Sequence, residues 1–200
     1  MSETLGARVR ILDAAEQLFA SHGFDATATS TIAKFAAVPK GLLFYYFPAK
    51  ADLLRALAAE RLGLGPINTA EIVEPGDPAR SLLNLTDRIR EIQGGSEALR
   101  VILWREQRAH PEVKANLLEH HGQLRILIER VLRGSLPRPV PATRVRAAAQ
   151  AWVAVLTMRP FAEQADGESE ESATELAELA ELICDGLVRR RPASRRASQE

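Results

Sequence analysis

The stretch from residue 27 to residue 50, TATSTIAKFAAVPKGLLFYYFPAK, constrains the fold most, because its pattern fits two short helices joined by a tight corner. Thr27 is the expected N-cap of the first helix, since its hydroxyl can accept a hydrogen bond from an otherwise unpaired backbone amide. We predict that this helix covers about residues 28–35 and that Phe35 continues its buried stripe. Pro39 fixes its own φ and suits the first position of the second helix.

The second helix carries KGLLFYY, and it cannot bury all of its large side chains. Leu43 and Phe47 lie four positions apart and can pack inward together. A lysine, a glycine and aromatic rings then stay outside, on a helix short enough to enter a DNA groove. Lysine can neutralise phosphates, tyrosine hydroxyls can bond to phosphate oxygens, and Gly41 allows the backbone to approach the duplex closely. The pattern therefore indicates a helix-turn-helix that binds DNA.

This stretch also resembles the N-terminal helix-turn-helix of the tetracycline-repressor (TetR) family. That family's pattern is roughly glycine-aromatic, a threonine cap, Ile-Ala, Ala-Gly-Val-Ser, Lys-Gly, an aromatic run ending in Phe, then Lys. Two positions depart from it: Ala37 stands where the corner usually has glycine, and Pro39 where it usually has serine. Ala37 is then expected at positive φ, which strains a residue with a side chain. The matching positions are Gly23-Phe24, Thr27, Ile32-Ala33, Ala36, Val38, Lys40-Gly41, Phe44 to Phe47 and Lys50.

The resemblance implies an all-α protein of about nine helices, and the many Ala and Leu residues favour helices as well. It implies a helix-turn-helix domain over residues 1–48 and a ligand-binding and dimerisation domain over residues 49–190. Residues 191–200 are expected to form a basic, disordered tail. The resemblance also implies a homodimer that binds a palindromic double-stranded DNA operator as a transcriptional regulator, usually a repressor. An unknown small-molecule effector would release this homodimer from the operator.

This interpretation assigns the contacts with DNA to particular side chains. Backbone contacts to DNA are expected from Lys40, Gly41, Tyr45, Tyr46 and Lys50, and contacts to base edges or thymine methyls from Thr29, Ser30 and Leu42. The alternative is a small-molecule-binding helical dimer whose head binds DNA weakly or not at all. The net charge of +0 and the two departures keep this alternative open.

Helical periodicity continues along the rest of the chain, and the last two predicted helices have wide apolar faces. We interpret these faces as a dimer seam, a four-helix bundle formed by two copies, with ordinary core packing as the alternative. The residues concerned are Val145, Ala148, Ala149, Trp152, Val153 and Leu156 in one helix, and Leu176, Leu179, Ala180, Ile183 and Leu187 in the other.

The predicted body also contains groups that could line a ligand cavity. His120 and His121 sit between leucines on an inward stripe, where they are either a pocket lining or a packed histidine pair. Trp104 is either a pocket wall or a core residue, and Trp152 is either a pocket lining or an interface filler. Arg105 or Arg108 could meet an acidic ligand. No carboxylate or cysteine is spaced to complete a metal site, so we expect neither a metal nor a cofactor. The list of candidate ligand-binding residues is Trp104, His120, His121 and Trp152.

Composition excludes several other classes of protein. A single cysteine, Cys184, excludes an intramolecular disulfide and a cysteine-rich zinc site. No apolar run approaches the roughly 20 residues that span a bilayer, and the N-terminus has no signal-like apolar segment. We therefore expect a cytoplasmic protein without a membrane partner. The chain has no glycine-rich nucleotide motif, zinc-protease motif or nucleophile elbow, which argues against an enzyme.

Overall fold

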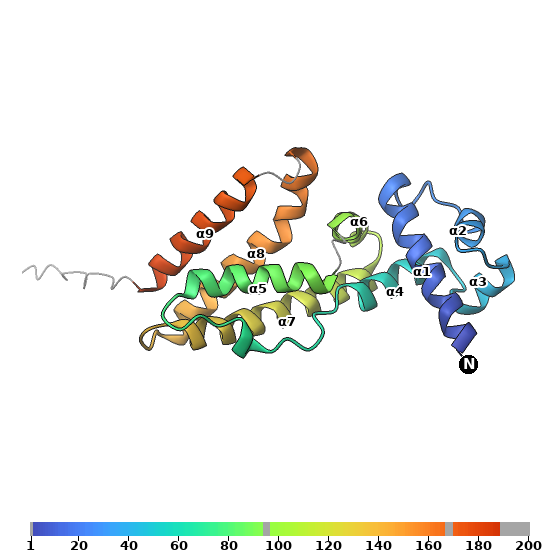
Figure 1. The fold of residues 1–200 in the computed structure, drawn as a ribbon. Coiled ribbons are helices and arrows are strands. Elements are labelled where there is room, and N and C mark those ends of the chain that lie inside the picture. Colours follow the sequence, from blue (N-terminus) through green and yellow to red (C-terminus); the bar gives the residue numbers. More distant parts are fainter. Residues whose placement is uncertain (1, 94–96, 167–169, 189–200) are drawn as a thin grey trace, which may run out of the picture.

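The computed structural model describes residues 2–93, 97–166 and 170–188, and every regular element in these ranges is helical (Figure 1). This confirms the prediction of an all-α fold with about nine helices. The elements are α1 (Ser2–His22), α2 (Thr29–Phe35), α3 (Lys40–Tyr46), α4 (Lys50–Arg61), the short 3-10 helix η1 (Thr69–Glu71), α5 (Pro78–Gln93), α6 (Glu97–Glu106), α7 (Pro111–Ser135), α8 (Ala142–Asp166) and α9 (Glu170–Val188).

The corner between α2 and α3 is formed as the sequence predicts. Ala37 has a φ of 52°, and the amide of Val38 donates to the carbonyl of Ala33 at 3.0 Å. Pro39 lies one position earlier than predicted, because its carbonyl accepts from Leu42 and Leu43 as the N-cap of α3. An alanine thus occupies the left-handed conformation that usually favours glycine.

The expectation that Thr27 caps α2 is wrong. Its side chain is buried, and its hydroxyl donates to the carbonyls of Gly23 at 2.7 Å and Leu18 at 3.2 Å. The N-cap of α2 is Ala28, which has no capping side chain. Thr27 therefore satisfies carbonyls at the C-terminal end of α1, where helices leave acceptors without partners.

The expected burial of Phe35 is also wrong, since 57% of this residue is exposed. The buried stripe of α2 is centred on Ile32, Ala33 and Ala36. At 100° per residue, position 35 falls just beyond the edge of that stripe. Phe35 consequently contributes an aromatic ring to the surface of the head, which we define as α1–α3.

The head is not packed separately from the rest of the chain. One buried cluster contains residues of α1 to α4 together with α6 residues such as Leu99 and Leu103 and the first turns of α7. The Phe24 ring also lies 5.3 Å from the ring of His110, the N-cap of α7. The division after residue 48 remains a prediction, but buried contacts cross it.

Ion pairs add to the connection between α1 and α4. Both terminal nitrogens of Arg8 donate to the Glu60 carboxylate, at 2.5 and 2.8 Å, and Arg61 pairs with Asp13 and Glu16. The hydrogen bond between Arg8 and Glu60 raises the pKa of the guanidinium and lowers the pKa of the carboxyl. A displacement of α4 therefore acts directly on α1 of the head.

The body, α5 and α7–α9, surrounds a second buried cluster. In Figure 1, α5 and α7 run alongside one another, while α8 and α9 rise from their far end. Trp152 is fully buried at its centre, and its indole nitrogen donates to the Thr86 hydroxyl at 3.3 Å. Both α8 and α9 contribute their apolar stripes to this cluster.

This packing corrects the predicted dimer seam, because most of the apolar residues assigned to it are buried within one chain. They are Val145, Ala148, Ala149, Trp152, Val153, Leu156, Leu176, Ala180 and Leu187. Periodicity identified apolar faces correctly but could not tell which partner covers them. Leu179 and Leu182 of α9 and Met158 of α8 do remain exposed, Leu182 by 70%.

The remaining regions are the segment between α4 and α5 and the C-terminal tail. The segment between α4 and α5 contains η1 and buries Ile72. The predicted basic tail, residues 191–200, lies outside the described residues. Among the residues that the structure describes, no helix combines the length and apolarity that crossing a membrane needs.

Candidate DNA interface and ligand pocket

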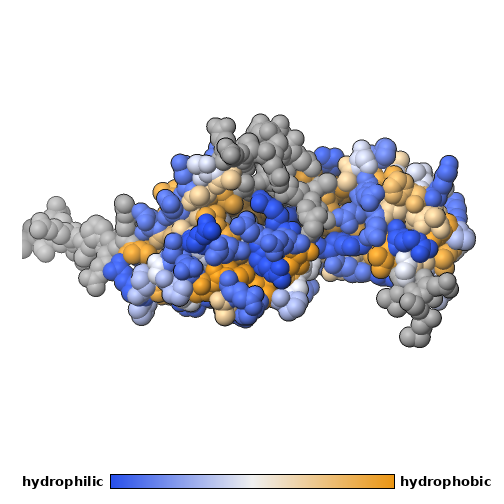
Figure 2. Space-filling view, in the orientation of Figure 1, coloured by the Kyte–Doolittle hydropathy of each residue, from blue (hydrophilic) through white to orange (hydrophobic). Residues whose placement is uncertain are grey.

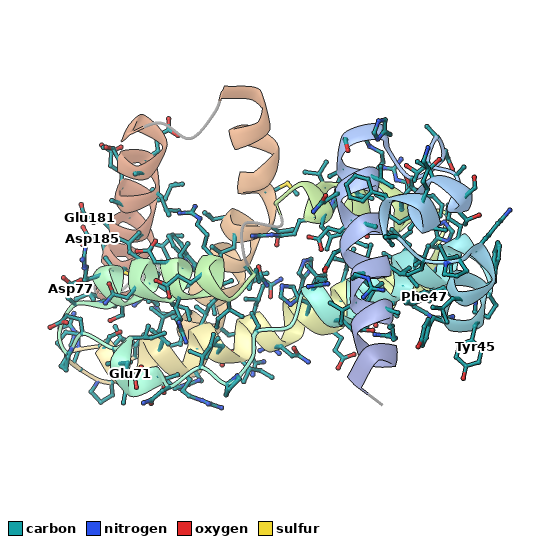
Figure 3. All side chains as sticks on the ribbon, turned by 45° about the vertical axis from the view of Figure 1, so that its right-hand side comes forward. Tyr45, Phe47, Glu71, Asp77, Glu181 and Asp185 are labelled. Carbon is teal, nitrogen blue, oxygen red and sulfur yellow. The ribbon has the colours of Figure 1, made fainter. Side chains whose placement is uncertain are left out.

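The first candidate site is the exposed side of α3. Leu43 and Phe47 are buried and hold the helix against α1 and α2, as their spacing predicts. Tyr45 is 75% exposed and points away from the head, whereas Phe47 turns toward α1 (Figure 3). The same short helix therefore has an apolar anchor on one side and a free phenol on the other.

The exposed side of α3 also carries a cation. Lys40 and Gly41 are exposed, and the Lys40 ammonium lies 5.6 Å from the centroid of the Phe44 ring. This cation–π contact directs the ammonium along the surface without burying it. The Tyr45 ring packs against the edge of the Tyr46 ring, with centroids 5.2 Å apart. The helix thus presents one positive charge and the exposed phenol of Tyr45, groups that suit a phosphate backbone, while Tyr46 is half-buried against the head core.

The candidates for base contacts lie on adjoining turns. Ser30 is exposed and Thr29 is half-buried in the first turn of α2, while Leu42 is half-buried against the head core. α2 and α3 pack against each other at the end of the molecule farthest from α9 (Figure 1). The structure therefore gathers these residues at one end of the molecule.

Lys50 has a different environment from Lys40. Its ammonium donates to the carbonyls of Phe24 at 2.8 Å, Asp25 at 3.1 Å and Thr27 at 3.2 Å. It also lies 4.4 Å from the centroid of the Phe24 ring. An ammonium has three protons to donate, so these carbonyls occupy its hydrogen-bonding capacity. We therefore revise the role predicted for Lys50, from phosphate binding to holding the α1–α2 loop on α4.

The second candidate site is a cavity in the body, enclosed by α5–α8 and the C-terminal end of α4. It has an interior volume of about 50 Å³, room for very few water molecules. Three of the four predicted ligand-binding residues line it, namely Trp104, His120 and His121. The full lining is Leu62, Thr86, Ile89, Arg90, Gln93, Arg100, Trp104, Leu117, His120, His121, Leu124, Leu156 and Thr157.

His120 is a buried titratable group of this lining. Only 9% of the residue is exposed, and its Nδ1 atom has no hydrogen-bond partner. Burial lowers its pKa to about 4, with further contributions from His121 and Arg100. Burial also lowers the pKa of His121, whose Nε2 lies 3.4 Å from the Thr157 hydroxyl. Both imidazoles are consequently neutral near pH 7.

Gln93 connects the cavity with the end of α4. Its Nε2 donates to the carbonyl of Leu62 at 3.2 Å, which fixes the orientation of the amide. The other amide atom, Oε1, is buried in the cavity lining without a hydrogen-bond partner. A buried polar atom without a partner costs about 1–3 kcal/mol, so such atoms call for an explanation.

Other predicted residues lie away from the cavity. Trp152 does not line it but lies behind Thr86, to which it donates its hydrogen bond. Arg105 and Arg108 are exposed outside it, and the guanidinium groups at the cavity belong to Arg90 and Arg100. Helical spacing could have identified Arg100, because it lies four positions before Trp104 and hence on the same side of α6.

Comparison with known proteins agrees with the geometry of the head. Residues 11–57 match the model of a family described as bacterial regulatory proteins, tetR family. The A-factor receptor protein of Streptomyces griseus is 32% identical over 74 residues, 37% of this chain and 25% of that protein. The transcriptional regulator UidR of Escherichia coli K12 is 29% identical over 129 residues, 60% of this chain and 61% of that protein. The matches thus span less than two thirds of either relative.

Solved structures extend the similarity to the whole fold. The fatty acid degradation regulator FadR from Bacillus halodurans superposes with a TM-score of 0.70 at 24% identity, covering 92% of this chain and 97% of that one. Identity this low shows the fold and not the ligand. Residues 11–57, with their corner at Ala37, are thus similar to the tetR family of bacterial regulatory proteins, and the helical body shares the fold of that solved structure.

Proposed function

We propose that this protein is a transcriptional repressor that binds operator DNA through α3 and is released by a small molecule bound in the cavity of the body. The observation that carries the proposal is the two-sided α3, within a head similar to the tetR family. Leu43 and Phe47 anchor the helix, and Lys40 and Tyr45 face outward. Such a helix can enter a major groove while its lysine and phenols contact phosphates.

The repressor would act as a homodimer. Leu179 and Leu182 leave apolar surface on α9, and Met158 leaves some on α8. A second copy that covered this surface through a twofold axis would form a four-helix bundle. The two α3 helices could then reach successive major grooves about 34 Å apart, on a palindromic operator. Apolar and polar residues are otherwise interspersed on the face of the molecule drawn in Figure 2.

Ligand binding in the cavity would release the repressor from DNA by moving α4. Leu62 lines the cavity at the end of α4, and Gln93 holds its carbonyl. Two residues at the end of α4, Glu60 and Arg61, connect it to α1. A ligand larger than the cavity has to move these walls, and it would shift the heads if it prefers the altered spacing.

A salt-dependent gel shift on the promoter region beside the protein's own gene tests this function. We expect a specific complex whose affinity falls steeply with salt, because lysine–phosphate contacts release counterions. The alternative is a small-molecule-binding helical dimer with weak or lost DNA binding, which the net charge of +0 favours. An affinity no higher than that for an unrelated duplex would support this alternative and refute the repressor.

A further inference from the structure

The charged side chains of the cavity lining are two arginines, which bears on the ligand it accepts. Arg90 of α5 and Arg100 of α6 line it together with His120 and His121 of α7. Among the described residues, its lining includes no aspartate or glutamate. Charges placed around a desolvated site act more strongly than charges on the surface, because water screens them less. The lining therefore disfavours a cationic ligand and favours an anionic one.

The polar atoms in the lining sharpen this preference. His120 Nδ1 and Gln93 Oε1 are both buried there without a hydrogen-bond partner, in residues that are 9% and 7% exposed. An imidazole can donate to an anionic oxygen, whereas the glutamine oxygen can only accept. A ligand that satisfies both atoms needs an acidic group, which accepts a hydrogen bond from the imidazole of His120. It also needs a hydrogen-bond donor elsewhere, such as a hydroxyl, for the amide oxygen of Gln93.

The hydroxyls of Thr86 and Thr157 donate to the helix carbonyls of Leu82 and Val153, and the remainder of the lining is mostly apolar. Leu117, Leu124 and Leu156 contribute to it from two helices, and the ring of Trp104 adds an aromatic wall. The leucine side chains provide no hydrogen bonds for a sugar or a polyphosphate, but together with the indole ring they can cover a hydrocarbon chain or ring. Ligand pockets of this type bind through apolar contact and are oriented by a few polar groups.

We infer that the effector of this protein is an amphipathic carboxylic acid, whose carboxylate is received by Arg90 and Arg100 beside His120 and whose apolar part lies against Leu117, Leu124 and Leu156. The inference rests on the proposed function, since it names the chemistry of the effector that the repressor would sense. Because the cavity holds only about 50 Å³, such an acid must displace its walls to enter.

Matched pairs of ligands test the inference on the full-length protein. Butanoate, octanoate, dodecanoate and phenylpropanoate would each be compared with the corresponding primary amide by isothermal titration calorimetry. The amide has nearly the same shape but no charge. We expect at least one acid to bind about tenfold or more tightly than its amide, because a hydrogen bond to a charged group contributes about 1.5–3 kcal/mol.

Variants assign this preference to the cavity. In Arg100→Met and Arg90→Met, the advantage of the acid over its amide should shrink at least severalfold. Arg105→Met provides a matched control, because Arg105 is an exposed arginine on the same helix outside the cavity. Thermal unfolding of each variant identifies any that fails to fold, and the second cavity arginine then decides the result.

The outcomes separate the inference from the function on which it rests. If no acid binds more tightly than its amide, or if acid binding is unchanged in both cavity variants, the inference is overturned. Salt-sensitive operator binding by the unliganded protein would still stand in that case. Absence of operator binding would refute the repressor, whereas selective binding of acids in the cavity would still support the assigned ligand class.

Discussion

The exposed side of α3 and the cavity of the body both gather cationic and aromatic side chains, but they differ in their relation to water. Tyr45 is 75% exposed, so water satisfies its hydroxyl until DNA replaces it. His120 and Gln93 are at least nine-tenths buried and have polar atoms that nothing satisfies. An exposed polar group bonds to water, so it costs little free energy before DNA binds. A buried polar group without a partner lowers the stability of the folded protein until a ligand bonds to it. The cavity should therefore respond to ligand in stability, and the α3 surface chiefly in affinity.

The largest expected effect separates the two sides of α3. Leu43→Ala should lower the free energy of unfolding by about 2–5 kcal/mol, because Leu43 is fully buried and its removal leaves a void in the head core. Tyr45→Ala, two positions away, should change stability by less than about 0.5 kcal/mol, since the ring is exposed. Urea unfolding measures both. Similar losses in the two variants would refute the assignment of an anchoring and a recognition side.

The next effect concerns the cavity and pH. The pKa of His120 is about 4 in the folded chain, below its ordinary value of 6.5, so the unfolded state binds the proton more readily. Stability is fully present above pH 6.5 and is lost as the pH falls from 6.5 to 4, by about 3 kcal/mol for this group. His120→Leu should flatten this part of the stability curve. A stability curve that stays equally steep in His120→Leu would contradict this assignment.

A somewhat smaller effect distinguishes the two lysines of the head. Lys50→Met removes three hydrogen bonds to carbonyls, and we expect a loss of about 2 kcal/mol in the free energy of unfolding. Lys40→Met should leave stability nearly unchanged, because the exposed Lys40 ammonium makes only a surface cation–π contact. Chemical denaturation of the two variants provides the test. Equal stability would show that Lys50 does not hold the α1–α2 loop.

The smallest effect tests the strained corner. Ala37→Gly should stabilise the protein by about 0.5–1 kcal/mol, because relief of the positive φ of 52° outweighs the greater freedom of unfolded glycine. Ala36→Gly, at the adjacent buried position with ordinary helical φ, should destabilise it by a similar amount. Thermal melts of both variants at the same pH would show the opposite signs. A destabilising Ala37→Gly would mean that the corner carries no relievable strain.

The sequence predicts the local parts of this molecule better than its long-range contacts. Helix bounds, the positive φ at Ala37 and the anchoring pair Leu43 and Phe47 follow from spacing within one or two turns of helix. The role of Lys50 could not be predicted, because its carbonyl partners lie 23–26 positions away.

The two candidate sites differ in the same manner. The α3 surface consists of neighbours in sequence, so one motif was enough to propose it. The cavity combines side chains from four helices with Leu62 at the end of α4, and the histidine pair is recognisable in the sequence only because it interrupts an apolar stripe. Gln93 gave no such signal, since a glutamine near the end of a helix is ordinary; only the approach of α4 buries it.

The central claim is that α3 binds DNA through charges on its exposed side. Fluorescence anisotropy with the promoter duplex, repeated over a range of salt concentrations, measures how many phosphates are neutralised. For Lys40→Ala we predict weaker binding to all sequences and a slope of log K against log salt that is smaller by about 1 for each bound subunit, while Lys114→Ala, on the exposed surface of α7, leaves the slope unchanged. A slope and affinity that Lys40→Ala leaves at the wild-type values would contradict the account.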